Sequence, residues 1–393
     1  MTSPACGFYW HERCFWHDPG AIGVFSAPGE FLQPQPASES PESKRRLKNL
    51  LEVSGVIDEL TVSKPPAATR DDLACFHTPR YLDELEAGAQ RGWGDAGEGA
   101  PYTAGSLAAA RQSAGLAIAA IDDVAHGRRR NAYALCRPPG HHAEVDRGRG
   151  FCLLGNIPIA LMRLRKHGNE STPRRIAVID WDVHHGNGTQ AAFYADPEVF
   201  SVSIHQAGNY PLDTGEFEEQ GQGDALGATL NLPLPPGCGI GAYRHAMRRL
   251  VLPAVAAFRP EMIVVACGYD ACGKDPLGKM LLNSAAFAEM TAQVQALADR
   301  LCQGRLVMIH EGGYSEGYVP LCGHAVIATL SGSRIEVHDP QNAEIAAWKY
   351  QSLQPHQREL IESWRHGWKR FGSLHEADDL VESCLAVDTQ QAR

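Results

Sequence analysis

The chain has 393 residues, of which 44% are hydrophobic and 21% charged, a balance typical of a soluble globular protein with a large core. The formal net charge of −10, with no basic stripe to offset it, excludes a nucleic-acid backbone as the expected partner. Eleven cysteines without a Cys-x-x-Cys pair indicate reduced thiols, and no apolar run approaches the roughly 18 residues of a membrane span. Because the N-terminus also lacks a basic region followed by an apolar core, we expect a cytoplasmic protein without membrane contact.

The first hundred residues are the least regular part of the sequence. Residues 8–17 are crowded with aromatic side chains and two histidines, which suit either the core or the mouth of a pocket. A loop rich in Pro and Ser then precedes a helix predicted over residues 44–56. Residues 92–105 predict a Gly-rich surface loop.

From residue 106 onward, helices and strands alternate, which predicts one large α/β domain whose mostly parallel sheet is flanked by helices. The expected strands cover residues 131–135, 176–179, 199–205, 262–266 and 306–310. The expected helices cover residues 106–126, 157–167, 190–194, 241–258, 284–302 and 320–330. We place the catalytic domain at residues 1–332, with irregular rim loops up to residue 105, and a C-terminal helical extension at residues 333–393. Helical pieces around residues 347–350 and 361–368 are expected to pack back onto the domain, and a homo-oligomer contact is the second interpretation.

One strand leads into a candidate metal site. The apolar run of residues 176–179 precedes Asp180, Asp182 and His184, which share a face if the chain stays extended. Two carboxylates and an imidazole on one side repel and desolvate each other unless a cation lies between them, and the mix of oxygen and nitrogen suits Zn²⁺. Solvated polar residues at a strand end are the alternative.

Polar, titratable side chains follow the other predicted strands as well. Because ligands of α/β sheets bind outside the carboxyl ends of the strands, we expect these side chains to meet at one edge. They are Arg137 to His142, Asp180 to His184, His205, Cys267 to Asp270 and Glu311 to Tyr314. Asp270 supplies the third ligand, so that Asp182, His184 and Asp270 leave one metal position open for water.

The remaining polar side chains suggest acid–base chemistry beside the metal. The tandem His141 and His142 suit proton transfer near pH 7, with Asp180 and Asn187 as the groups that orient the two rings. Tyr314 could donate its phenol to a developing oxyanion. Away from a metal site, the histidine pair would more often be structural and Tyr314 would more often be packing.

These motifs resemble the class II histone deacetylase family, which includes bacterial histone-deacetylase-like amidohydrolases. The resemblance runs from about residue 9 to about residue 332. It is carried by Arg137-Pro138-Pro139-Gly140-His141-His142, by Gly150-Phe151-Cys152, by residues 180–188 and by Glu311-Gly312-Gly313-Tyr314. It implies an arginase/deacetylase fold and removal of acetyl or related acyl groups from an acylated, lysine-like amine.

The resemblance also implies roles for particular residues. Asp182, His184 and Asp270 would hold one zinc ion, and a structural potassium ion would lie near Asp180 and the backbone of Ser203-Ile204. Phe151 and Tyr210 match the walls of an acyl-lysine tunnel, with Gly150 beside them. The base and acid would be His142, held by Asn187, while His141 stays charged against Asp180.

Four positions separate this chain from relatives of the family. Gly186 stands where the two-manganese arginases carry a further Asp, which favours a single metal. Tyr314 is the residue of the active type. No clear counterpart of the peptide-gripping rim carboxylate is present around Ala104-Gly105. Leu277 stands where the polyamine-selective member carries a gatekeeping Glu.

Three functions therefore remain open. The first is a zinc amidohydrolase acting on acyl-lysine-like amides. The second is a small-molecule amide hydrolase acting on an acylpolyamine or a xenobiotic amide. The third, of another class, is an inactive acyl-lysine binding module. The complete set of ligands, histidines and Tyr314 disfavours the third.

Overall fold

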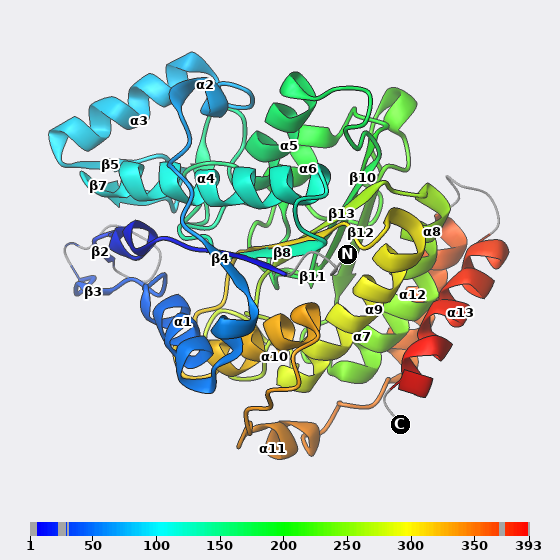
Figure 1. The fold of residues 1–393 in the computed structure, drawn as a ribbon. Coiled ribbons are helices and arrows are strands. Elements are labelled where there is room, and N and C mark those ends of the chain that lie inside the picture. Colours follow the sequence, from blue (N-terminus) through cyan, green and yellow to red (C-terminus); the bar gives the residue numbers. More distant parts are fainter. Residues whose placement is uncertain (1–5, 23–28, 30, 369–373, 392–393) are drawn as a thin grey trace.

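The computed structural model describes residues 6–22, 29, 31–368 and 374–391, and these form one eight-stranded sheet between two layers of helices (Figure 1). Neighbouring strands of this sheet are parallel throughout. Their order is β12 (Thr229–Leu234), β11 (Val199–Gln206), β10 (Ile176–Asp180), β13 (Met262–Cys267), β14 (Leu306–His310), β8 (Asn131–Ala134), β1 (Gly7–Tyr9) and β4 (Thr61–Ser63). The predicted α/β class with a mostly parallel sheet is confirmed.

Two groups of helices cover the two faces of the sheet (Figure 1). One face is covered by α4 (Ser106–Ala125), α5 (Asn156–His167) and α6 (Asn187–Phe193), with α2 (Arg70–Leu73) and α3 (Pro79–Arg91) outside them. The other face is covered by α1 (Glu42–Ser54), α7 (Ile240–Ala246), α8 (Leu252–Phe258), α9 (Ser284–Cys302), α10 (Val319–Ser331), α12 (Pro355–Gly367) and α13 (His375–Gln391). A π-helical turn, Met247–Val251, joins α7 to α8, so the helix predicted over 241–258 is one continuous run.

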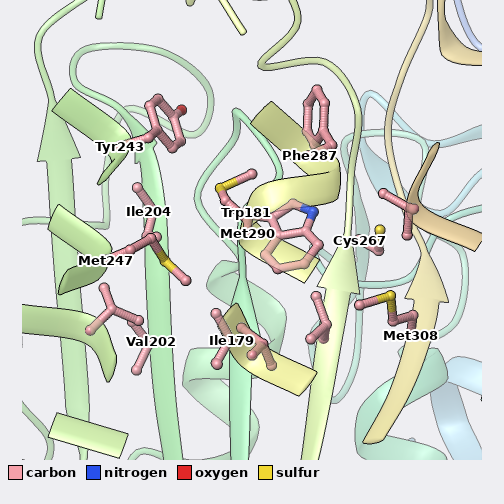
Figure 2. Close-up of a cluster of buried hydrophobic side chains, with 14 of the residues drawn as sticks. Ile179, Trp181, Val202, Ile204, Tyr243, Met247, Cys267, Phe287, Met290 and Met308 are labelled. Atoms are coloured by element: carbon pink, nitrogen blue, oxygen red, sulfur yellow. The ribbon is translucent and has the colours of Figure 1, made fainter. Parts of the chain in front are cut away.

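The central strand β10 buries both of its faces because its residues alternate between the two layers. Ile176 and Val178 belong to the apolar cluster under α4 and α5. Ala177, Ile179 and Trp181 belong to the cluster under α9. Figure 2 shows Trp181 among side chains of β10, of neighbouring strands and of α9, including Ile179, Cys267 and Met290. The indole is fully buried, and the large apolar area that it removes from water anchors the start of the loop that follows β10.

Three strands of the sheet, and three short strands within residues 92–105, do not follow from the sequence pattern. β1 and β4 have only three residues each, which is too short for an alternating pattern to be recognised. β12 contains Pro233, which argues against a strand but is tolerated at the edge of a sheet. The loop predicted over 92–105 is wrong, since this segment holds β5 (Trp93–Asp95), β6 (Gly97–Glu98) and β7 (Pro101–Thr103).

Short pairings place this segment beside the loop that follows the tandem histidines. β5 pairs with β7, and β6 pairs in parallel with β9 (Gly148–Arg149). A further short ladder joins β2 (Ala21–Ile22) to β3 (Gln35–Pro36). Cross-chain pairing over two or three residues is set by tertiary contacts, which a local sequence pattern does not show.

The C-terminal residues are helical in part. The helix expected around 347–350 is wrong: α11 (Asn342–Ala346) ends just before it, and the chain then turns. The helix expected over 361–368 overlaps α12, and α13 was not anticipated. Ile345, Ile361 and Trp364 are buried in the same apolar cluster as Trp181, so these helices share the core of the sheet. Within the described residues, none of the helices combines the length and apolar character needed to cross a bilayer.

Candidate active site

The loops that leave β8, β10, β13 and β14 at their carboxyl ends converge on one edge of the sheet. Three residues from two of these loops, Asp182, His184 and Asp270, form what we call the ligand cluster. One ligating atom of each lies within 4.8 Å of the others, and both carboxylates are fully buried. The strand ends at Asp180 rather than continuing to His184, yet the loop keeps Asp182 and His184 together on one side.

Backbone hydrogen bonds hold the two carboxylates of the ligand cluster in place. The backbone N–H of Gly312 donates to Asp182 Oδ2 and that of Val183 donates to Asp270 Oδ1, both at 2.7 Å. His184 Nδ1 lies 3.1 Å from Asp182 Oδ1 and equally far from Asp270 Oδ2. One imidazole proton cannot satisfy two buried carboxylates at once, whereas a cation can.

The electrostatics of the cluster fit a divalent metal. Burial and the negative charge of the neighbouring Asp182 raise the pKa of Asp270, which shows that two carboxylates at this place repel each other. An imidazole with two carboxylates is a donor set that suits Zn²⁺ and leaves a position for water. At Gly186, a Cβ would lie 2.2 Å from Asp180 Oδ2, so the position at which the arginases carry another Asp has no room for a side chain.

Both tandem histidines are buried beside the ligand cluster, and each has its own partner. His141 Nδ1 lies 2.9 Å from Asp180 Oδ2, and its Nε2 lies 3.8 Å from Asp182 Oδ1. His142 Nδ1 donates to Asn187 Oδ1 at 2.8 Å, because the amide nitrogen of Asn187 is itself a donor to other oxygens. This arrangement leaves Nε2 of His142 as the nitrogen that can accept a proton.

The surroundings push the two imidazoles toward opposite charge states. Burial alone would lower the pKa of His141, but the carboxylates of Asp182 and Asp180 outweigh it and raise the pKa to about 10. Burial lowers the pKa of His142 far below its usual value, and the positive charges of His141 and His184 lower it further. Two titratable groups whose pKa values are pushed apart are the pattern expected of an acid–base site.

Tyr314 lies beside His184 of the ligand cluster. Its ring centroid is 6.4 Å from that of His184, and its backbone N–H donates to Asp275 Oδ2 at 2.7 Å. Burial, together with the charges of Asp182 and Asp270, raises the pKa of Tyr314 well above its usual value. The phenol therefore keeps its proton and can act as a donor.

The residues expected to form the tunnel walls lie over these reactive groups. The ring of Phe151 is 5.7 Å from that of Tyr314, and the ring of Tyr210 stands perpendicular to His142 at 5.1 Å. Gly150 has a φ of +48°, and a Cβ there would lie 2.5 Å from the His142 ring, so only glycine fits between His142 and Tyr210. Leu277 is half-buried, and its carbonyl accepts from Asn209, the neighbour of Tyr210.

A carboxylate does stand near these tunnel residues, although Ala104-Gly105 supplies none. It belongs to Glu98 of β6, whose side chain is 56% exposed and bonds to Arg149 at 2.8 Å. The Tyr210 hydroxyl donates to the Glu98 carbonyl at 3.2 Å. The Gly-rich pattern of residues 92–105 predicts a loop, so it does not indicate that Glu98 lies on a short strand beside Tyr210.

Three further carboxylates that position the site were not assigned roles from the sequence. Glu311 Oε2 accepts from the backbone N–H groups of Gly140 and His141 and so ties the tandem histidines to β14. Glu144 Oε1 accepts from Asn187 at 2.9 Å, and Asp275 holds Tyr314. Glu311 begins the Glu311-Gly312-Gly313-Tyr314 motif, Asp275 stands two residues before Leu277, and Glu144 stands two residues after His142. Only the folded chain shows what they bond.

Two other places are of interest near the site. A cavity of about 10 Å³, the size of one water molecule or ion, is lined by Asp180, Ser203 and Asn231 among others. His17 lines a larger cavity of about 670 Å³ together with Glu39 and Arg137. His141, Cys152 and Glu311 also lie close together, but burial raises the pKa of the Cys152 thiol well above its usual value, so we assign no metal to them.

Comparisons with known proteins indicate one family of deacetylases. The histone deacetylase domain model matches residues 37–330. The histone deacetylase-like amidohydrolase of Pseudomonas aeruginosa is 49% identical over 337 residues, which cover 85% of this chain and 88% of that relative. A probable deacetylase of Archaeoglobus fulgidus is 37% identical over 320 residues, or 80% of this chain and 88% of its own.

Solved structures agree as well. The crystal structure of the HDA15 HD domain superposes with a TM-score of 0.80 at 27% identity, covering 97% of this chain and 99% of that one. The match confirms the predicted deacetylase-type α/β fold. Family membership supports a deacetylase or amide-hydrolase activity on acylated amines and suggests a metal cofactor. The chain therefore belongs to the histone deacetylase family.

Proposed function

We propose that the protein is a zinc-dependent amidohydrolase that removes acetyl or related acyl groups from acyl-lysine-like amides. One observation carries the proposal: the ligand cluster lies together with two imidazoles of opposite charge preference and a protonated phenol at one edge of the sheet. Asp182, His184 and Asp270 would hold the zinc ion. When bound there, zinc polarises an amide carbonyl and lowers the pKa of a water molecule.

The protein groups divide the remaining work. His142, neutral and oriented by Asn187, takes a proton from water at Nε2 and later gives it to the leaving amine nitrogen. His141 stays protonated against Asp180 and stabilises negative charge nearby. The phenol of Tyr314 donates to the former carbonyl oxygen as that oxygen becomes an anion. Phe151 and Tyr210 exclude water and hold the aliphatic part of the substrate.

We also propose a structural ion and a cellular location. The small cavity beside Asp180 and Ser203 supports a structural potassium ion. The acidic net charge is the reason to expect no nucleic-acid partner. The eleven cysteines without a Cys-x-x-Cys pair are the reason to expect reduced thiols and a cytoplasmic location. A homo-oligomer and the division at residue 332 stay predictions.

A small-molecule amide hydrolase is the second candidate. The absence of a carboxylate at Leu277 weakens the case for a polyamine, while the exposed carboxylate of Glu98 offers a partner for the backbone N–H groups of a peptide. Peptidic acyl-lysine substrates therefore gain support over small amides.

The experiment is a substrate profile of the purified protein, metal-free and with zinc added. We expect acetyl-lysine peptides to be hydrolysed, chelation to abolish turnover, and roughly one equivalent of zinc per chain to restore it. Preference for acetylpolyamines or simple anilides would establish the second candidate instead. A zinc-loaded protein that binds acyl-lysine but hydrolyses no acyl amide would be a binding module.

A further inference from the structure

Arg149 is an almost fully buried arginine that joins three carboxylates from separate segments. Its side chain is 2% exposed. One terminal nitrogen, Nη2, donates to Glu98 Oε2 at 2.8 Å and to Asp213 Oδ1 at 2.9 Å. The other, Nη1, donates to Glu144 Oε1 at 3.2 Å and to Asp213 Oδ2 at 3.3 Å. Both terminal nitrogens are thus committed to carboxylates of the protein.

These partners surround the mouth of the predicted tunnel. Glu98 is on β6, and its backbone carbonyl accepts a hydrogen bond from the Tyr210 hydroxyl. Asp213 follows Tyr210 by three residues. The guanidinium carbon lies 5.7 Å from the centre of the Tyr210 ring. Arg149 itself directly precedes Gly150 and Phe151, which lead to the opposite wall. One side chain therefore connects both walls and the rim.

We propose that Arg149 is a specificity-determining residue, whose guanidinium sets the position of the tunnel walls and rim by joining Glu98, Glu144 and Asp213. The inference rests on the proposed hydrolysis of an acyl amide at this site. Arg149 acts on the substrate through Tyr210 and Glu98 rather than by touching the reacting atoms.

The three carboxylates do not depend on Arg149 equally. The side chains of Glu98 and Asp213 are 56% and 59% exposed, so without the guanidinium two like charges are free to separate into water. Glu144 is only 19% exposed and also bonds Arg147 at 2.9 Å and Asn187 at 2.9 Å. Removal of Arg149 therefore loosens the mouth but leaves the Glu144–Asn187–His142 chain in place.

This asymmetry predicts which kinetic constant changes. The mouth contacts the amine side of the substrate in the ground state and in the transition state alike, so its loss weakens binding more than the chemical step. A lysine at position 149 keeps the charge but, as a compact ammonium on one stem, cannot bond three carboxylates in the geometry of a planar fork.

The test compares Arg149→Met, Arg149→Lys and a matched control, Arg163→Met. Arg163 also joins two carboxylates, Asp72 at 2.5 Å and Asp122 at 2.7 Å, but these bonds connect α5 to α2 and α4. For an acetyl-lysine peptide we expect both Arg149 variants to raise KM about tenfold with kcat within about threefold of the parent. The rise should be smaller for a compact acetylanilide, and Arg163→Met should change neither constant.

A second variant keeps the proposal testable if Arg149→Met does not fold. Asp213 accepts two of the four hydrogen bonds that Arg149 donates to carboxylates. Asp213→Asn removes the exposed charge from these two bonds and should raise KM about threefold for the peptide. Hydrogen exchange gives a readout that needs no turnover: exchange in residues 97–98 and 210–215 should quicken in the Arg149 variants and stay at the parent rate in Arg163→Met.

The outcomes separate this inference from the proposed function. An inactive zinc-loaded parent contradicts the proposed function, and the exchange rates then still decide whether Arg149 holds the mouth. Parent-like KM with parent-like exchange overturns the inference. A parent-like KM in Arg149→Lys also overturns it, because a positive charge alone would then be sufficient. So does a loss of kcat at unchanged KM, because Arg149 would then act on the position of His142 and not on the mouth.

Discussion

The interior of the site and its rim are built in different ways. In the interior, Asp182 and Asp270 follow directly on strands of the sheet, are fully buried, and accept backbone hydrogen bonds. At the rim, Glu98 and Asp213 come from short pairings and turns, are more than half exposed, and depend on one arginine. The interior is thus fixed by the fold, while the rim is fixed by side-chain charges, which suits a constant chemistry with adjustable substrate choice.

The largest effects are expected where the interior loses a ligand. Asp182→Ala and Asp270→Ala should each abolish hydrolysis and leave far less than one equivalent of zinc bound, because two remaining protein ligands hold zinc weakly. Metal analysis alongside activity checks this. Retention of zinc, or two manganese ions in the parent, would contradict the single-zinc assignment.

The tandem histidines should differ, although both lie in the interior. His142→Ala is expected to lower kcat by about 10²–10⁴, the usual worth of a general base, and His141→Ala by less, with zinc retained in both. Steady-state kinetics with metal analysis tests the division. Equal losses of kcat, or loss of zinc, would count against separate roles for a neutral His142 and a charged His141.

Tyr314→Phe keeps the buried ring and removes only the phenolic donor. We expect kcat for an acetyl-lysine substrate to fall by about 10²–10³, while folding and zinc content are unchanged. A trifluoroacetyl substrate, whose carbonyl is already activated, should lose less. Parent-like turnover of the acetyl substrate by this variant would exclude the oxyanion role.

The smallest expected effect is on stability, through a buried carboxylate that supports the interior. Glu39 is fully buried under the tandem-histidine loop, 2.8 Å from Arg137. Burial opposes its ionisation, but Arg137 and Lys44 outweigh burial and lower the pKa of Glu39. Since the folded pKa is the lower one, its contribution to stability is complete above the unfolded value of about 4.3 and is lost as pH falls through the folded value.

Chemical denaturation from pH 7 to pH 3 measures this contribution. The parent should lose about 1.4 kcal/mol of unfolding free energy for each pKa unit between the two states, and Glu39→Gln should lack that part of the slope. The same slope in both proteins would mean that Glu39 is not ionised in the fold.

Local patterns in the sequence were enough to predict which ligand-type residues meet in the interior of the site. The apolar runs that become β10, β13 and β14 have the length and residue types of buried strands, and a polar residue after a parallel strand must lie at the carboxyl edge. The types of those residues then indicated metal and acid–base chemistry. The motif that includes Tyr314 was likewise readable because it is contiguous.

Only the tertiary structure decided the rim and the supporting contacts. Glu311 bonds Gly140 across 171 residues of sequence, and Glu98 meets Arg149 across 51. Such partners are chosen by where strands of two or three residues pair, as β6 does with β9, and these pairings follow from the packing of the whole domain. Strand periodicity is a local property of the chain, whereas the bonding of an isolated charge depends on which distant segment the fold brings beside it.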